Sequence, residues 1–307
     1  MKNENDKLLN LILEIAQIPS FTTHEKRLHP FIQDYCSNLG LPLLHLNDGS
    51  ILVETPGKGE MSVALSAHLD KNDYWTRKGE EQPEELNASI NGENLKGLLD
   101  DAIGVGVCLY MIEQSLKGKF PPLKILFSEC EEGFFKQYYT YETIGKLRNN
   151  GITSNGVKYS SGMGAQILSS YLMQKKEIPS ALFVIDVTPL FDGEPGIALY
   201  SEPWEITNDK PTPELKSRTE KMESKLKKIC PRIVKANNVN DYAFYGKMFS
   251  MNDMIVPCFA LEPSIEYYHS PNEKVNVHDV TETVKILDKF LKWFPDNVID
   301  HSCSKTI

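Results

Sequence analysis

Short apolar segments alternate with longer amphipathic segments along most of the chain, and this alternation restricts the fold more than any other feature. Strands are predicted at 61–67, 123–129, 181–185 and 255–261, and helices at 101–116, 163–176, 213–229 and 279–294. Strands that alternate with helices form parallel sheets whose two faces the helices cover. The sequence therefore predicts an α/β fold with a mostly parallel mixed sheet and helices on both faces. No linker-like tract interrupts residues 1–307, which predicts a single domain.

The residues before this alternation are predicted to form two helices and a hairpin. Apolar residues recur at helical spacing from Leu8 to Ile15. The sequence TTHE at 22–25 has the pattern of a capping box for a second helix, which extends to Leu39 and stops at Gly40. The segments LLHL and ILVET are joined through NDGS, which predicts a β-hairpin.

Two segments differ from the strand–helix pattern. Residues 71–99 are polar and rich in turn-forming residues, with a short hairpin predicted around 91–94. Residues at about 134–160 are rich in aromatic and polar side chains and are predicted to form an inserted loop or small subdomain. Long loops of this kind in compact domains are often lids or contact surfaces.

The composition excludes several classes of protein. A hydrophobic content of 41% and a charged content of 24% are typical of a globular chain. The net charge of −9 argues against a nucleic-acid partner, which would need clustered Lys and Arg. No apolar run has the length of a membrane span, so no membrane partner is expected.

The cysteines and the amino terminus indicate a cytoplasmic protein. The chain has six cysteines, which form no CxxC pair and lie scattered, several of them within apolar runs. Cysteines in that pattern are typically reduced and buried. The first twenty residues lack the basic leader and the small-residue cleavage site of a signal peptide. We therefore expect a cytoplasmic location without structural disulfides.

Metal-binding residue types follow the predicted strands. They are His68 and Asp70, Glu131 and Glu132, Asp186 and His269, together with Asp100 before the helix at 101–116. In open α/β sheets, ligands bind outside the carboxyl ends of the strands. Burying carboxylates without a counter-charge costs several kcal/mol each, so a divalent metal centre explains strands that end in charge. Nitrogen and oxygen ligands suit zinc, with cobalt or manganese as alternatives. Each group alone also fits an ordinary surface or hydrogen-bonded role, and the combination favours metal.

These groups lie in five short motifs that resemble those of a known enzyme family. The motifs are SAHLD (66–70), GLLDDAIGVG (97–106), FSECEEG (127–133), VIDVTP (184–189) and YYHSPNE (267–273). In this order they resemble the dinuclear-zinc metallopeptidases, which include the cytosolic glutamyl and tetrahedral aminopeptidases and the single-domain zinc aminopeptidases. The resemblance covers most of the chain and implies a three-layer sandwich around the sheet.

The resemblance also implies a role for each ligand. Asp100 would bridge two divalent ions. His68 and Asp186 would complete one metal site, and Glu132 and His269 would complete the other.

Two further residues would act in catalysis. Asp70 would hold the imidazole of His68 in its orientation, and Glu131 would be the general base. The implied reaction is attack of a metal-bridged hydroxide on a peptide carbonyl. The expected enzyme is an aminopeptidase. Successive side chains on a strand point opposite ways. At a strand end, Glu132 could therefore bind metal while Glu131 faces the substrate. Of the roles considered for Tyr267 and Tyr268, aromatic packing beside the site is favoured over stabilisation of an oxyanion.

Alternatives remain open at this point. The same metal pair would serve a dipeptidase, a deacylase or a carboxypeptidase acting on a peptide or another small amide. An acyltransferase similar to glutaminyl cyclase would need one zinc, and a non-catalytic binding protein would need none. The insertion at about 134–160 leaves the substrate preference and the formation of a homo-oligomer open.

Overall fold

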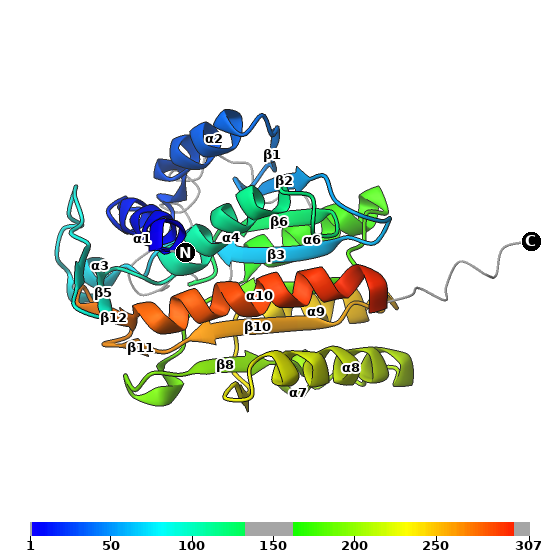
Figure 1. The fold of residues 1–307 in the computed structure, drawn as a ribbon. Helices are drawn as coiled ribbons and strands as arrows, with labels where there is room; N and C mark the ends of the chain where they lie inside the picture. The colour runs from blue at the N-terminus through cyan, green and yellow to red at the C-terminus, as the bar shows by residue number, and fades with distance from the viewer. Residues whose placement is uncertain (1, 133–161, 298–307) are drawn as a thin grey trace, which may run out of the picture.

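An eight-stranded mixed sheet forms the centre of the computed structural model, which describes residues 2–132 and 162–297 (Figure 1). The strand order is β1-β2-β6-β3-β7-β10-β8-β9. The strands are β1 (Leu43–His45), β2 (Ile51–Thr55), β3 (Val63–His68), β6 (Leu123–Ser128), β7 (Ala181–Ile185), β8 (Ile197–Tyr200), β9 (Val234–Ala236) and β10 (Cys258–Pro263). The central strands β6, β3, β7 and β10 run parallel, whereas β2 and β8 join this group antiparallel. The predicted mostly parallel mixed sheet is confirmed.

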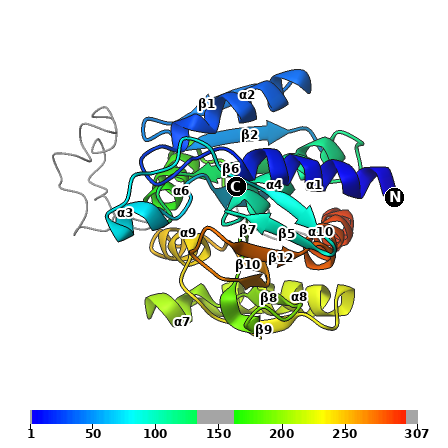
Figure 2. The same ribbon diagram turned by 90° about the vertical axis from the view of Figure 1, so that its left-hand side faces the viewer.

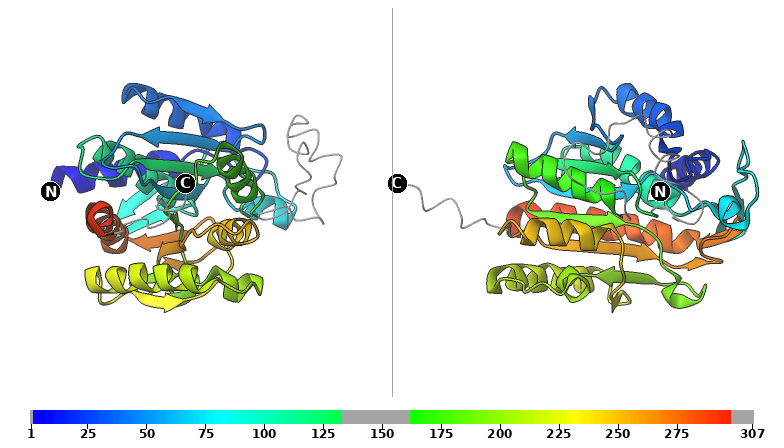
Figure 3. Two further views of the ribbon diagram at one scale, coloured as in Figure 1. Left: turned by 90° about the vertical axis from the view of Figure 1, so that its right-hand side faces the viewer. Right: turned by 180° about the vertical axis from the view of Figure 1, so that it is seen from behind.

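Helices cover both faces of the sheet. The first face carries α1 (Lys2–Ala16), α2 (His29–Asn38), α4 (Ala102–Ser115), α8 (Pro213–Ile229) and α10 (Val277–Asn297). The second face carries α6 (Met163–Lys175), α7 (Pro203–Thr207) and α9 (Asp241–Ser250). Figures 2 and 3 show α10 on one side of the strands and α6 and α9 on the other, seen from opposite ends.

Each face of the sheet has its own hydrophobic core. Successive residues of β3 alternate between the two cores, so that Leu65 and Ala67 lie in the first and Ala64 lies in the second. Every residue of β3, β6, β7 and β10 is buried. Strands with two buried faces have continuous apolar sequences. These four strands could therefore be predicted from their apolar runs.

A second, antiparallel sheet lies beside the first, at the end of β10. Its strand order is β11-β12-β5-β4, and its strands are β4 (Ser89–Asn91), β5 (Asn94–Gly97), β11 (Ile265–Glu266) and β12 (Glu273–Asn276). The short helix α3 (Tyr74–Lys78) lies at the same end of the molecule (Figure 1). The hairpin of β4 and β5 confirms the one predicted around 91–94. The pairing of β12 with β5 was not predicted, because it joins segments far apart in the sequence.

The amino-terminal predictions have mixed outcomes. The first helix and the β1–β2 hairpin are confirmed. The second helix ends close to the predicted position, since Gly40 adopts a φ of +73° just beyond it. The predicted capping box is wrong, because α2 begins only at His29, after the 3₁₀ helix η1 (Glu25–Arg27). The hydroxyl of Thr22 donates instead to Asp70 Oδ2, at 2.8 Å.

Other predictions bear on the chain as a whole. The assignment of 1–307 to one catalytic domain stays a prediction, and the insertion predicted at about 134–160 lies outside the described residues. The five cysteines of the described part of the chain are buried and form no disulfide with one another. None of the helices in 2–132 and 162–297 combines the length and apolar character needed to span a lipid bilayer.

Candidate metal centre

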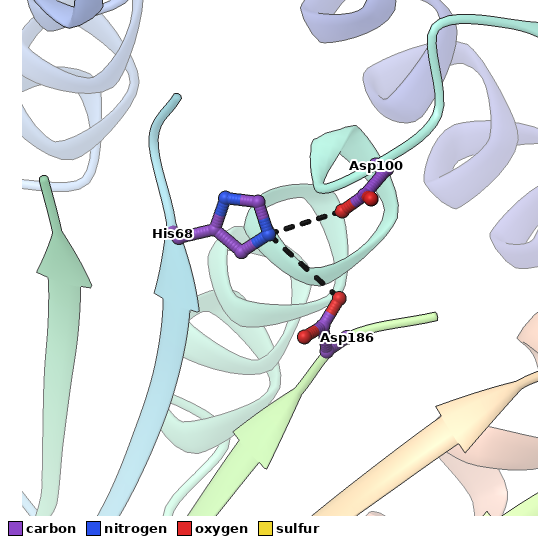
Figure 4. A group of neighbouring side chains, drawn as sticks. All are labelled: His68, Asp100 and Asp186. Atoms are coloured by element: carbon purple, nitrogen blue, oxygen red, sulfur yellow. Dashed lines mark hydrogen bonds and ion pairs between the residues drawn. The ribbon is translucent and has the colours of Figure 1, made fainter. Parts of the chain in front are cut away.

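Three of the predicted ligands meet where β3, β7 and the start of α4 converge. His68 is the last residue of β3, Asp186 follows β7, and Asp100 lies in the turn before α4 (Figure 4). The Nε2 atom of His68 lies 3.0 Å from Asp100 Oδ1 and 3.7 Å from Asp186 Oδ1. One ligand atom from each residue falls within 4.8 Å of the others, a spacing that would admit one metal ion.

The other two predicted ligands form a second group that shares Asp100. His269 Nε2 lies 3.3 Å from Glu132 Oε1 and 3.5 Å from Asp100 Oδ2. The two oxygens of Asp100 therefore face different imidazoles, Oδ1 toward His68 and Oδ2 toward His269. The structure thus places all five candidate ligands in two adjoining groups of three.

Unsatisfied atoms in the second group fit a metal ion. Glu132 Oε1 and His269 Nε2 are buried and have no hydrogen-bond partner, although they face each other. A carboxylate oxygen and an imidazole nitrogen are both ordinary ligands of zinc. Buried polar atoms normally find partners, so two facing ligand-type atoms without one fit a metal site.

The surrounding charge also favours cations. Beyond the ligand set, further carboxylates near the site are at most 2% exposed: Asp70, Asp101, Asp241, Glu262 and Glu273. Burial raises the pKa of Glu132 and Asp186, and the negative charge of Asp100 raises both further. The buried ammonium of Lys71 is a partial counter-charge, and burial lowers its pKa to about 8. This much buried negative charge is costly unless protons or metal ions compensate it.

Asp70 contacts His68 mainly through its main chain. The His68 Nδ1 atom lies 2.8 Å from the main-chain oxygen of Asp70 and 3.4 Å from its Oδ1 atom. A carbonyl oxygen only accepts, so Nδ1 carries the proton and Nε2 is directed at Asp100. The Asp70 carboxylate accepts hydrogen bonds from the main-chain N–H groups of Glu131 and Glu132, at 2.9 and 3.2 Å. Asp70 therefore fixes the segment that carries both glutamates.

Asp101, which follows the shared carboxylate, has a structural role. Its side chain caps α4 by accepting a hydrogen bond from the Gly104 N–H group at 2.6 Å, and its other oxygen lies 3.3 Å from the main-chain nitrogen of His68. A Cβ atom at Gly104 would lie 2.2 Å from both Asp101 and the Ile185 carbonyl oxygen. Glycine is required there because α4 approaches the end of β7 so closely.

The strand geometry predicted for the two glutamates is wrong. β6 ends at Ser128, and Cys130 adopts a φ of +60°, so that Glu131 and Glu132 lie on a turn. Strand alternation therefore does not set the directions of these two side chains. Glu129, by contrast, is buried on another side, with Oε1 3.5 Å from His29 Nε2.

Two further residues support the candidate ligands. The Glu273 carboxylate accepts hydrogen bonds from the main-chain N–H groups of Leu99 and Asp100 and, through its other oxygen, from that of His269. Asn240 donates to Asp186 Oδ2 at 3.2 Å and also to Glu262. These contacts were missed in the sequence. The one available signal was the position of Glu273 at the end of the motif YYHSPNE (267–273).

The tyrosines before His269 differ in their surroundings. The ring of Tyr268 stacks on the His269 imidazole, with centroids 3.6 Å apart, whereas Tyr267 is 60% exposed. The stacking agrees with the interpretation of aromatic packing beside the site.

The metal-free protein is expected to lose stability as the pH rises from about 6.5 to about 10. Burial alone would lower the pKa of His269, but its contacts with Asp100 and Glu132 raise it to about 10. The pKa of His68 is likewise raised, through Asp100, Asp186 and Asp70. The stabilisation from both imidazolium groups is complete below 6.5, their ordinary value, and is lost as the pH rises through the folded-state pKa.

Carboxylates with a lowered pKa do not reverse this trend. The pKa of Asp100 is lowered by the two imidazoles in spite of burial, and its contribution is already complete above its ordinary value of 3.8. Thermal unfolding of chelator-treated protein between about pH 6 and 9.5 measures the effect. Added zinc should restore the stability at high pH, because a cation would replace the lost positive charge. A melting temperature that rises with pH would contradict the expectation.

Comparisons with known proteins bear on the fold. No family model matches the sequence. A protein from Haemophilus influenzae described as an uncharacterized hydrolase is 22% identical over 167 residues, which make up 52% of this chain. The match covers only 35% of that relative's length.

Several solved peptidase structures superimpose over nearly the whole chain. An aminopeptidase from the archaeon Desulfurococcus kamchatkensis gives a TM-score of 0.64 at 12% identity, covering 94% of this chain and 95% of its own. The TET1 peptidase from Pyrococcus horikoshii gives 0.60 at 15% identity, covering 92% and 99%. A tripeptidase from Staphylococcus aureus gives 0.60 at 12% identity, covering 94% and 98%. The chain has the fold of these peptidases. The resemblance seen in the motifs is thus confirmed at the level of the fold.

Proposed function

We propose that the protein is a two-metal hydrolase that removes amino-terminal residues from peptides. The observation that carries this proposal is the sharing of Asp100 between two groups of three ligand-type side chains. In each group the ligand atoms lie within 4.8 Å of one another. The peptidase fold of the solved neighbours supports the choice of an amide bond as the target.

The proposal assigns the five ligands to two divalent ions, with zinc as the first choice and cobalt or manganese as alternatives. Asp100 would contact both ions. His68 and Asp186 would hold the first ion, and Glu132 and His269 would hold the second. Two ions held by these residues would lower the pKa of a bound water and polarise the scissile carbonyl.

The other residues of the site would move the proton and hold the geometry. Glu131 would accept a proton from the attacking water as its oxygen bonds to the carbonyl carbon. The same carboxyl would then deliver that proton to the amine nitrogen as the carbon–nitrogen bond breaks. Asp70 would keep this base in place, because its carboxylate accepts a hydrogen bond from the Glu131 main-chain N–H group.

Metal analysis tests the number of ions first. Protein purified without chelator and re-equilibrated with zinc is expected to hold two ions per chain by elemental analysis. One ion would favour the single-zinc acyltransferase instead. Folded protein that holds none would overturn the proposal.

A substrate panel then tests the position of cleavage. We expect hydrolysis of short peptides that have a free amino terminus and loss of turnover when that amine is acetylated. Peptides amidated at the carboxyl terminus serve as the matched control and should still be cleaved. Preference for amino-blocked substrates would assign a deacylase, and dependence on the free carboxylate would assign a carboxypeptidase or dipeptidase.

Self-association and location belong to the same proposal. The TET1 peptidase of Pyrococcus horikoshii assembles into a tetrahedron or a large octahedral shell. That behaviour supports a homo-oligomer here as well, and light scattering on the purified protein would measure it. The cytoplasmic location stays a prediction from the cysteine pattern.

A further inference from the structure

Asn72, which lies outside the recognised motifs, contacts one of the candidate ligands directly. Its Nδ2 atom donates a hydrogen bond of 2.8 Å to Glu132 Oε2, and the side chain has no solvent exposure. The Asn72 Oδ1 atom is buried without a hydrogen-bond partner. The amide is therefore oriented by Glu132 alone, since the reverse orientation would place Oδ1 against a carboxylate oxygen.

This contact divides the two oxygens of Glu132 between different tasks. Oε2 receives the Asn72 amide, and the guanidinium of Arg77 lies 3.8 Å from the same oxygen. Oε1 is left buried without a hydrogen bond and faces His269 Nε2 at 3.3 Å. One oxygen is thus held by the protein and the other is presented to the second group of ligands.

The geometry assigns Asn72 as a positioning residue that selects Oε1 as the single oxygen through which Glu132 binds the second ion. This inference rests on the proposed two-metal function. Hydrogen bonds from outside the ligand set commonly orient metal-binding carboxylates in this way. With Oε2 engaged, Glu132 would offer only Oε1 to the second ion.

Asn72 is the third of three alternate residues, beginning at the end of β3, that contact the candidate metal centre. His68, Asp70 and Asn72 are alternate residues of one segment, and each contacts the metal centre differently. His68 belongs to the first ligand group, the Asp70 carboxylate fixes the main chain of Glu132, and Asn72 fixes its side chain. A single extended segment therefore positions groups in both candidate metal sites.

Zinc affinity, rather than stability, separates a positioning role of Asn72 from a purely structural one. Asn72→Leu removes the unsatisfied amide oxygen, but it also takes the hydrogen-bond donor away from the buried Glu132 Oε2. A lower melting temperature of the metal-free variant is therefore expected for either role. For a positioning role, zinc affinity at the second site should fall about 10- to 100-fold while the first site is unchanged, as for other lost outer contacts to a ligand.

Calorimetric zinc titration of metal-free protein provides the test, with Glu132→Gln identifying the second site. Asn72→Leu should weaken that site alone, and Asn72→Ser, which retains an O–H donor, should recover part of the affinity. Asn72→Ala replaces the leucine variant if that variant fails to fold. Gln82→Leu is the matched control, because Gln82 donates a similar 2.7 Å bond to Asp73 in the same segment. Its two affinities should equal those of the wild type.

The outcomes separate this inference from the proposed function. Two unchanged zinc affinities in Asn72→Leu would overturn the role of Asn72 and leave the two-metal hydrolase standing. Equal weakening of both sites would show a merely structural role and would also overturn it. Wild-type protein that binds fewer than two ions would overturn the function and the inference together.

Discussion

Glu131→Gln is expected to reduce peptide hydrolysis by about 10²- to 10⁴-fold while both ions remain bound. The amide has the shape of the carboxylate but cannot accept the proton of the attacking water. The five candidate ligands are untouched by the change, and the main-chain hydrogen bond from residue 131 to Asp70 Oδ1 is retained. Steady-state kinetics combined with elemental analysis of the same sample measures both parts of the prediction.

Glu129→Gln is the matched control for this experiment. Glu129 lies two residues earlier and is 2% exposed, and its carboxylate faces His29 rather than the two ligand groups. We expect its turnover to stay within a few-fold of the wild type. Full activity in Glu131→Gln would remove Glu131 from the role of base, and loss of zinc from that variant would make it a ligand instead.

Asp100→Ala is expected to release both ions and with them all detectable activity. Its two oxygens face His68 and His269 separately, so that each ligand group loses a member. The effect should exceed the roughly 10- to 100-fold loss of affinity that follows removal of an outer hydrogen-bond partner. Elemental analysis after equilibration with zinc measures the loss.

Asp186→Ala distinguishes a shared ligand from an unshared one. Asp186 belongs to the first group only, so this variant should retain one ion, held through Glu132 and His269. Added zinc should still raise the melting temperature of Asp186→Ala, because a ligand that binds only the folded state stabilises it. Loss of one ion in both variants would show that Asp100 does not link the two sites.

Local sequence patterns were sufficient for the central strands and the long helices. β7 was predicted with its observed bounds, and α8 likewise, because an apolar run and an amphipathic repeat each identify their element without reference to the rest of the chain. Shorter elements such as β8, α7 and α9 were missed. Their length and mixed composition leave too weak a periodic signal.

The candidate ligands could also be predicted from sequence, because residue type and position after a strand restrict where they lie. Parallel strands bring their carboxyl ends to one edge, so the His, Asp and Glu side chains that follow the strands were expected there together. The resemblance of the five motifs added which of these residues would share each metal site. The sequence by itself thus determined the type of fold and the composition of the candidate centre.

Only the tertiary structure decided how these residues are oriented and supported. The turn at Cys130, the use of the Asp70 main-chain oxygen by His68, and the hydrogen bond from Asn72 to Glu132 have no local sequence signal. Each depends on contacts between segments brought together by the sheet, such as the 60 positions between Asn72 and Glu132. Side-chain hydrogen bonds depend on distances of a few tenths of an ångström, and only the folded chain determines those distances.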